Sequence, residues 1–171
     1  VVLVVATILL NLPNEEEKFL EKWNNAGAQI SENRLYEEVT IDELNQILAS
    51  KKADETTFVF FATPENADSV TYFSQVVNHA NTHDVSKVYL VDSAFAIGTR
   101  EEGNDLDKQL SEIEAKFKVD EDATFKLDSV PNIWVFKGDV LVETVDDYEE
   151  ADNKWNAALA QLFTYAYKEK Q

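Results

Sequence analysis

Blocks of apolar and polar residues along the chain predict a series of strands and amphipathic helices. Two runs, residues 57–62 and 87–92, are apolar almost throughout, which is typical of strands buried on both faces of a sheet. Between them, apolar residues recur with helical spacing from about residue 64 to residue 81, with Pro64 at the first helical position. This order predicts a right-handed βαβ unit whose two strands are parallel.

The flanking segments extend this pattern in both directions. A short strand is predicted over residues 33–39, and Thr40 with Glu43 forms a capping-box pattern before a helix over residues 41–48. Downstream, the pattern predicts a loop, a helix, an irregular polar segment, a β-hairpin and a C-terminal helix, over residues 93–103, 106–117, 120–129, 132–145 and 155–166. No repeat or long linker interrupts residues 31–171, which we expect to form one domain.

This order of elements, with two local motifs, resembles the thioredoxin-like superfamily. Residues 58–64, with the sequence FVFFATP, resemble the family's central strand as it enters the active-site helix. Residues 130–138, with the sequence VPNIWVFKG, resemble the family's cis-proline strand and hairpin. The resemblance covers about residues 31–168. It implies an α/β fold, a central mixed sheet flanked by helices, in which the bond before Pro131 is cis.

The chain departs from the family at the positions of the two redox cysteines. Glu65 and Asp68 stand there, with Asn66 and Ala67 between them, and the chain contains 0 cysteines. The family's reaction needs a thiolate at a helix N-terminus, so thiol–disulfide exchange is excluded. We interpret Glu65 and Asp68 as acids that favour the helix dipole. Because the dipole stabilises their charged forms, it opposes the raised pKa of a general acid.

The family resemblance also implies a docking edge for an extended peptide. Its candidates are Thr63 and Pro64 before the helix, and Val130 and Pro131 before the hairpin. The alternative interpretation is a turn that serves the fold and binds nothing.

The first residues of the chain predict a membrane contact. Residues 1–10 are almost wholly apolar and Leu12 extends the run, but a bilayer span needs about 20 such residues. We therefore interpret residues 1–13 as the second half of a membrane anchor whose start is missing. A signal-peptide core and an ordinary buried segment remain open. Residues 14–30 then predict an acidic stem helix, and acid after the apolar run suits the extracytoplasmic side.

The charge and composition exclude several classes of function. The chain carries 15 basic and 33 acidic residues, a net charge of −18, which disfavours nucleic-acid binding and adsorption to anionic lipid. His79 and His83 are four residues apart but lack a third metal ligand. The acidic runs at 120–122 and 146–150 lack a calcium-loop pattern. We expect no metal and no cofactor.

These observations predict a binding protein and not an enzyme. We expect a non-redox thioredoxin-like domain, tethered by a single-pass anchor on the extracytoplasmic side of the cell membrane, that serves a membrane assembly as an accessory or scaffold protein. It resembles bacterial accessory proteins that accompany bacteriocin export, and its partner is expected to be a membrane-associated protein. Three alternatives remain open: a structural subunit whose residues 1–25 pack against other spans, an enzyme with a non-thiol carboxylate site, and a soluble peptide-binding chaperone.

Overall fold

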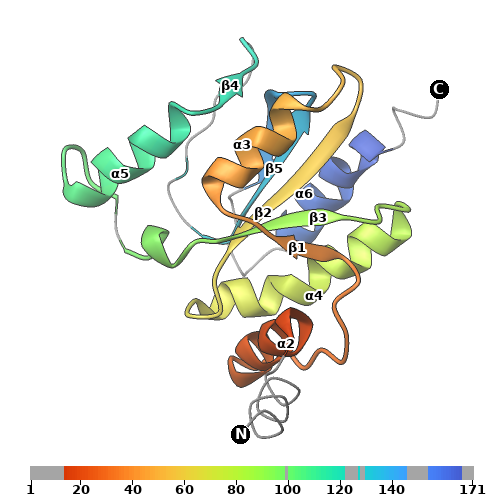
Figure 1. Cartoon of the computed structure of the whole chain (residues 1–171). Coiled ribbons are helices and arrows are strands. Elements are labelled where there is room, and N and C mark those ends of the chain that lie inside the picture. The colour runs from red at the N-terminus through yellow and green to blue at the C-terminus, as the bar shows by residue number, and fades with distance from the viewer. Residues whose placement is uncertain (1–13, 99, 122–126, 128–129, 146–153, 167–171) are drawn as a thin grey trace, which may run out of the picture.

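A six-stranded mixed sheet forms the centre of the protein in a computed structural model, which describes residues 14–98, 100–121, 127, 130–145 and 154–166 (Figure 1). The strands are β1 (Tyr36–Glu38), β2 (Thr56–Ala62), β3 (Val88–Asp92), β4 (Lys118–Val119), β5 (Asn132–Lys137) and β6 (Val140–Val145). Their order across the sheet is β1-β3-β2-β5-β6-β4.

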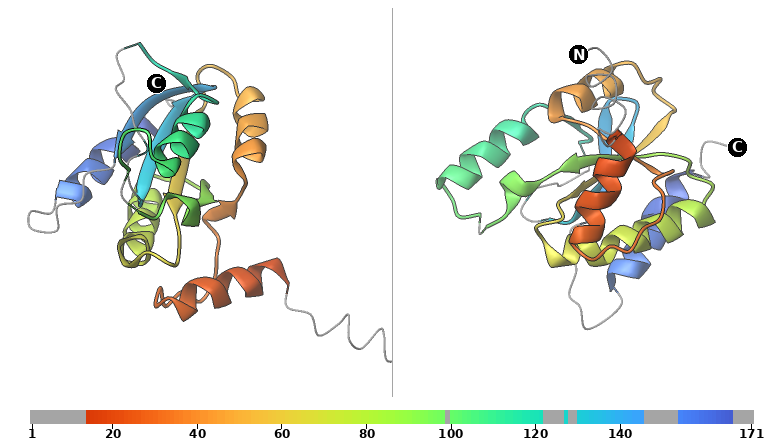
Figure 2. Two further views of the ribbon diagram at one scale, coloured as in Figure 1. Left: turned by 90° about the vertical axis from the view of Figure 1, so that its left-hand side faces the viewer. Right: turned by 60° about the horizontal axis from the view of Figure 1, so that its bottom comes forward.

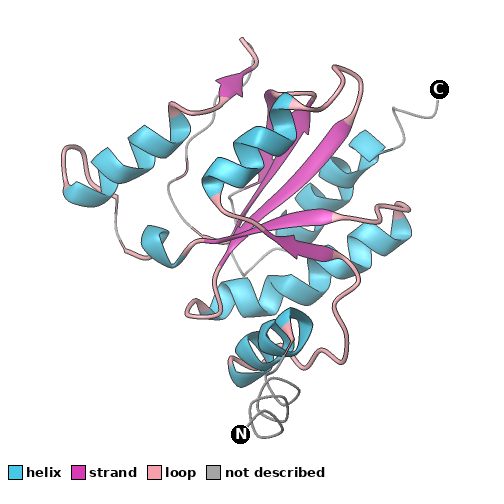
Figure 3. Ribbon diagram, in the orientation of Figure 1, coloured by secondary structure: helices cyan, strands magenta, loops and turns pink. Residues whose placement is uncertain are grey.

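Helices cover both faces of this sheet (Figures 1 and 3). They are α2 (Glu15–Asn25), α3 (Ile41–Ala49), α4 (Ala67–Thr82), α5 (Asp105–Glu114) and α6 (Lys154–Phe163), with short 3-10 turns η1 (Ala94–Ala96) and η2 (Thr164–Ala166). Helices α3 and α5 pack on one face, and α2, α4 and α6 contribute to the core on the other. The left view of Figure 2 shows α3 and α6 on opposite sides of the sheet.

The strand directions confirm the predicted βαβ unit and hairpin. Strands β1, β3 and β2 are mutually parallel, and β5 runs antiparallel to both β2 and β6. In the β2–β5 pair, Phe60 lies opposite Ile133 and Phe58 opposite Val135. The Val130–Pro131 bond is cis, as the resemblance implied. The fold is therefore mixed α/β, with the strand order and directions of the thioredoxin-like fold.

The turn between β5 and β6 depends on glycine. Gly138 has φ of +58°, and a Cβ there would lie 3.0 Å from the Ala53 Cα atom. An L-residue at this position would meet both a strained dihedral and backbone atoms that have no room to move.

Each face of the sheet has its own apolar core. On the α3/α5 face, the largest fully buried side chains are Phe61, Trp134, Phe136, Leu44, Leu110 and Leu127. On the other face they are Trp23, Phe60, Phe73, Phe163, Leu90 and Ile133. Alternation along β2 and β5 sends successive side chains to opposite cores, which is why the two strands are apolar throughout.

Helix α2 is packed into the second of these cores. Asn14 and Glu17 form a capping box at its start. Phe19 and Trp23, one turn apart, are buried against Phe73 of α4. The acidic stem helix predicted over residues 14–30 is thus a helix over residues 15–25 whose apolar side is covered by the domain.

Three predicted boundaries were wrong. Helix α4 begins at Ala67 and not at Pro64, because the Asn66 side chain accepts a hydrogen bond from the Ser69 N–H (2.8 Å) and caps the helix there. The predicted strand over 33–39 shortens to β1, because Asn33 turns back and bonds to the backbone of Tyr36. The two-residue strand β4 follows α5 where only a helix end was predicted.

Candidate functional site

The positions that hold cysteines in the thioredoxin-like family form the entry to α4. Glu65 is exposed in the turn before the helix, and Asn66 is the N-cap. Ala67 is the exposed first residue of α4, and Asp68 lies half-buried in its first turn. A carboxylate in the first turn gains about 0.3–1 kcal/mol from the helix dipole. This arrangement supplies two solvated acids and no enclosed acid–base pair.

The four candidate docking residues differ in their exposure to solvent. Thr63, Val130 and Pro131 are buried, and Pro64 is half-buried. A partner at this edge therefore meets Pro64 and Glu65 first, with the other three residues as the support behind them.

An ionic cluster missed at the sequence level supports this edge from the side of α2. The Lys22 ammonium lies 2.7 Å from Glu38 Oε1 and 2.9 Å from Asp92 Oδ2. Burial alone would raise the pKa of Asp92, but Lys22, with hydrogen bonds from Thr63 and from the Ala94 N–H, lowers it below its usual value. Burial likewise opposes the charge of Lys22, but its two carboxylates raise its pKa. The cluster links α2, β1 and β3 to Thr63.

A second network holds the segment that leads toward Val130. The Arg100 side chain is only 5% exposed and forms a two-armed ion pair with Glu114 at 2.6 and 3.1 Å. Its other bonds go to Asp107 Oδ1 (2.7 Å), Ser111 Oγ (2.9 Å) and the Leu127 carbonyl (3.3 Å). Glu114 Oε1 also accepts a hydrogen bond from the Leu127 N–H (2.6 Å). Arg100 and Glu114 together fasten Leu127 to α5.

Asn132, directly after Pro131, carries an unsatisfied amide. Its side chain is fully buried, opposite Phe61 in the sheet, and neither its Nδ2 nor its Oδ1 has a hydrogen-bond partner in the described part of the chain. Burying an unpaired amide is costly, because its hydrogen bonds to water are lost and not replaced.

Replacing Asn132 by an apolar residue is therefore expected to stabilise the protein. Asn132→Val should raise the free energy of unfolding by about 1 kcal/mol, measured by urea denaturation. Asn132→Ala, which adds no volume, separates the polar effect from overpacking. A loss of stability in both variants would contradict an unpaired amide.

The two histidines join α4 to the C-terminal helix. His79 Nε2 lies 2.8 Å from Asn156 Oδ1, and His83 Nδ1 lies 2.8 Å from the His79 carbonyl. Both rings also contact the Phe163 ring, with centroids 6.1 and 6.0 Å apart. Across the described residues, no group of three or more His, Cys, Asp or Glu side chains is arranged to hold a metal ion.

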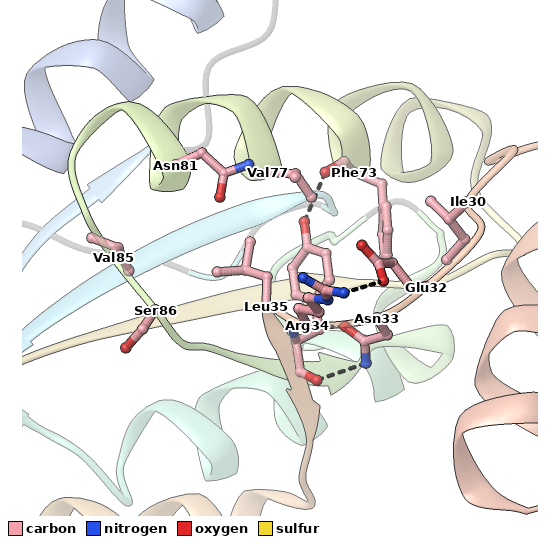
Figure 4. Close-up of a pocket in the computed structure, with 11 residues that line it drawn as sticks. Ile30, Glu32, Asn33, Arg34, Leu35, Phe73, Val77, Asn81, Val85 and Ser86 are labelled. Atoms are coloured by element: carbon pink, nitrogen blue, oxygen red, sulfur yellow. Dashed lines mark hydrogen bonds and ion pairs between the residues drawn. The ribbon is translucent and has the colours of Figure 1, made fainter.

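A groove lies away from these residues, between α4 and the segment that enters β1 (Figure 4). It has a volume of about 490 Å³, with apolar walls that include Leu35, Phe73 and Val77. Within its wall the Tyr36 hydroxyl donates to the Phe73 carbonyl (2.8 Å). The Asn33 side chain also hydrogen-bonds to both the N–H and the C=O group of Tyr36. These backbone groups of the edge strand β1 are therefore not available to pair with a further strand.

Within the described ranges, none of the helices is long and apolar enough to cross a bilayer. The predicted anchor, residues 1–13, lies outside the residues that the structure describes. Of the two acidic runs, the structure describes only Asp120 and Glu121, which are both exposed. Residues 122 and 146–150 lie outside the described residues.

Comparison with known proteins gives a likeness in structure but none in sequence. No protein-family model matches the sequence, and no curated protein sequence is significantly similar to it. Among solved structures, the chain is similar to thioredoxin O2 from Arabidopsis thaliana in its oxidized state, with 15% sequence identity and a TM-score of 0.47. The match covers 76% of this chain and 96% of the thioredoxin. A likeness at this level says nothing about activity, ligands or partners.

Proposed function

We propose that the protein is a non-redox, thioredoxin-like binding domain, tethered through residues 1–13 on the extracytoplasmic side of a cell membrane. It serves a membrane assembly as an accessory or scaffold protein. We further propose that it is related in role to the bacterial accessory proteins of bacteriocin export. The partner is a membrane-associated protein, and it docks at the edge formed by Pro64 and Glu65.

One observation carries this proposal. The end of the sheet that the family uses keeps its architecture, with β2 beside β5 and a cis bond before Pro131, but the turn before α4 presents Glu65 and Asp68 where a thiol reaction needs cysteine. A retained architecture that lacks the cysteine nucleophile supports a binding function over a catalytic one.

The position of α2 supports a tethered domain over a structural subunit. Phe19 and Trp23 face the protein's own core, so the apolar side of α2 is already covered and is not free to pack against other spans. A tether that continues directly into α2 would hold the docking edge close to the membrane, where tethering raises the effective concentration of partner and edge.

Site-specific crosslinking tests the proposal. A photoreactive amino acid replaces exposed Glu65 in one protein and exposed Asn78, farther along α4, in a matched control. We expect a discrete crosslinked product from membranes with the probe at 65, a much weaker one with the probe at 78, and loss of membrane recovery when residues 1–13 are deleted. Equal crosslinking at both positions, or none at 65, would overturn the docking edge. Unchanged membrane recovery after the deletion would overturn the tether.

A further inference from the structure

A second groove lies at the carboxyl ends of β1 and β3, where α3 begins. Its volume is about 340 Å³, at the lower end of the range of about 300–1,000 Å³ that ligand sites occupy. Val39, Val91 and Phe95 supply apolar lining. Its charged lining consists entirely of carboxylates among the described residues, namely Glu38, Glu43 and Asp92. The groove therefore combines an apolar surface with negative charge.

The chain itself shows which cation these carboxylates accept. The Lys22 ammonium, which arrives from α2, is held by Glu38 and Asp92 at 2.7 and 2.9 Å. Primary ammonium groups and carboxylates at such distances form charge-assisted hydrogen bonds. Lys22 therefore supplies one positive charge beside three carboxylates, and the groove keeps a net negative charge.

The third carboxylate is held in place at the first turn of α3. Glu43 Oε2 accepts hydrogen bonds from both the N–H and the hydroxyl group of Thr40, each at 2.8 Å. These bonds lower the pKa of the Glu43 carboxyl, which stays ionised at neutral pH. The carboxylate remains exposed to solvent, so an incoming cation reaches it without displacing a side chain.

Apolar surface continues beyond the groove on the same loop. Phe95 is half-buried, and Ile97, two residues on, is 45% exposed. Among the described residues, Ile97 and Val119 are the two exposed large hydrophobic side chains, and Ile97 is the more exposed of them. Phe95 and Ile97 together give a partner's apolar side chain a surface to cover beside the carboxylates.

We propose that this groove binds a cationic peptide segment of a protein partner. An apolar side chain of the peptide packs against Ile41 and Phe95, and flanking lysine or arginine side chains pair with Glu43 and with Glu38 beside Lys22. The net charge of −18 attracts such a segment from a distance and repels acidic ones. The inference rests on the proposed function as a protein-binding domain, and it assigns the chemistry of the partner.

Fluorescence anisotropy with the full chain tests this proposal. The probe is a fluorescein-labelled hexapeptide in which a leucine–tryptophan pair has two lysines on each side, and the control peptide carries glutamates in place of the lysines. The double variant Glu38→Gln, Glu43→Gln removes two charges and keeps the α3 capping box, which accepts glutamine. Its matched control is Asp54→Asn, Glu112→Gln, at two exposed acids outside the groove and outside the connection that carries Phe95 and Ile97.

The lysine peptide is expected to bind saturably and the glutamate peptide to show no binding. The groove variant should weaken binding about tenfold, and the control variant less than about twofold. Phe95→Ala should also weaken it, and peptide-induced amide NMR shifts should centre on Val39, Val91 and Phe95. Equal loss in the two double variants would mean that general charge attraction alone holds the peptide, which overturns the proposal.

The test separates this inference from the proposed function. If the lysine peptide fails to bind while the probe at position 65 still crosslinks, the proposal for the groove is contradicted and the proposal for the docking edge is retained. If the peptide binds in the groove and position 65 does not crosslink, the docking edge is wrong.

Discussion

Trp23→Ala is expected to lower the free energy of unfolding by about 4 kcal/mol, although residue 23 lies in a helix that precedes the thioredoxin-like elements. The Trp23 side chain is fully buried, and its ring centroid lies 4.3 Å from that of Phe73 and 6.3 Å from that of Phe19. No acceptor among the described residues bonds its ring N–H, so the loss comes from packing and from the cavity left behind. Urea denaturation followed by circular dichroism measures it.

Two further variants on the same helix control this result. Glu21→Ala, at an exposed position of α2, should change stability by less than about 0.5 kcal/mol. Trp23→Phe retains a ring against Phe73 and should lose clearly less than Trp23→Ala. If Trp23→Ala costs no more than Glu21→Ala, α2 is an independent stem and not part of the domain.

Arg100→Met is expected to destabilise the protein by about 3 kcal/mol, because it removes the cation that pairs with the largely buried carboxylates of Asp107 and Glu114. The two carboxylates hold the pKa of Arg100 above its usual value, with Glu114 as the larger cause. Loss of Arg100 also releases one of the two groups that fasten Leu127. Denaturation in urea at pH 7 measures the change.

The matched variant is Arg100→Lys, which keeps the charge but not the two-armed geometry with Glu114. We expect it to retain part of the stability and Arg100→Met to lose most of it. Exposed Arg34, paired with Glu32 at the surface, supplies the contrast: Arg34→Met should cost less than about 1 kcal/mol. Equal effects at positions 34 and 100 would contradict a buried network.

Most of the secondary structure could be predicted from the sequence, because its signals are local. The capping box of Thr40 and Glu43, the apolar runs of β2 and β3, and the glycine turn at Gly138 each depend on neighbouring residues. The start of α4 and the length of β1 were predicted wrongly, because an asparagine side chain hydrogen-bonds to the nearby backbone in each case. Asn66 capped α4 three residues later than Pro64 indicated, because a hydrogen bond to the Ser69 N–H outweighs proline's preference for a first helical turn.

The candidate site was predicted only in part. The positions of Glu65 and Asp68 follow from the motif, and so does the absence of thiol chemistry. The Lys22–Glu38–Asp92 cluster has no local signal, because Lys22 is 16 residues from one partner and 70 from the other. The same holds for the groove beside β3, whose lining comes from two strands, a 3-10 turn and the start of a helix.

The sequence by itself determined most of the segments that form strands and helices, that no cysteine chemistry is available, and that the protein is strongly acidic, since these follow from residue type and short-range spacing. Only the tertiary structure decided that α2 belongs to the core, that Arg100 is buried among acids, and that an acidic, apolar-lined groove lies beside Phe95. Those features arise when distant segments are brought together by the burial of apolar surface, and that burial depends on the whole chain at once.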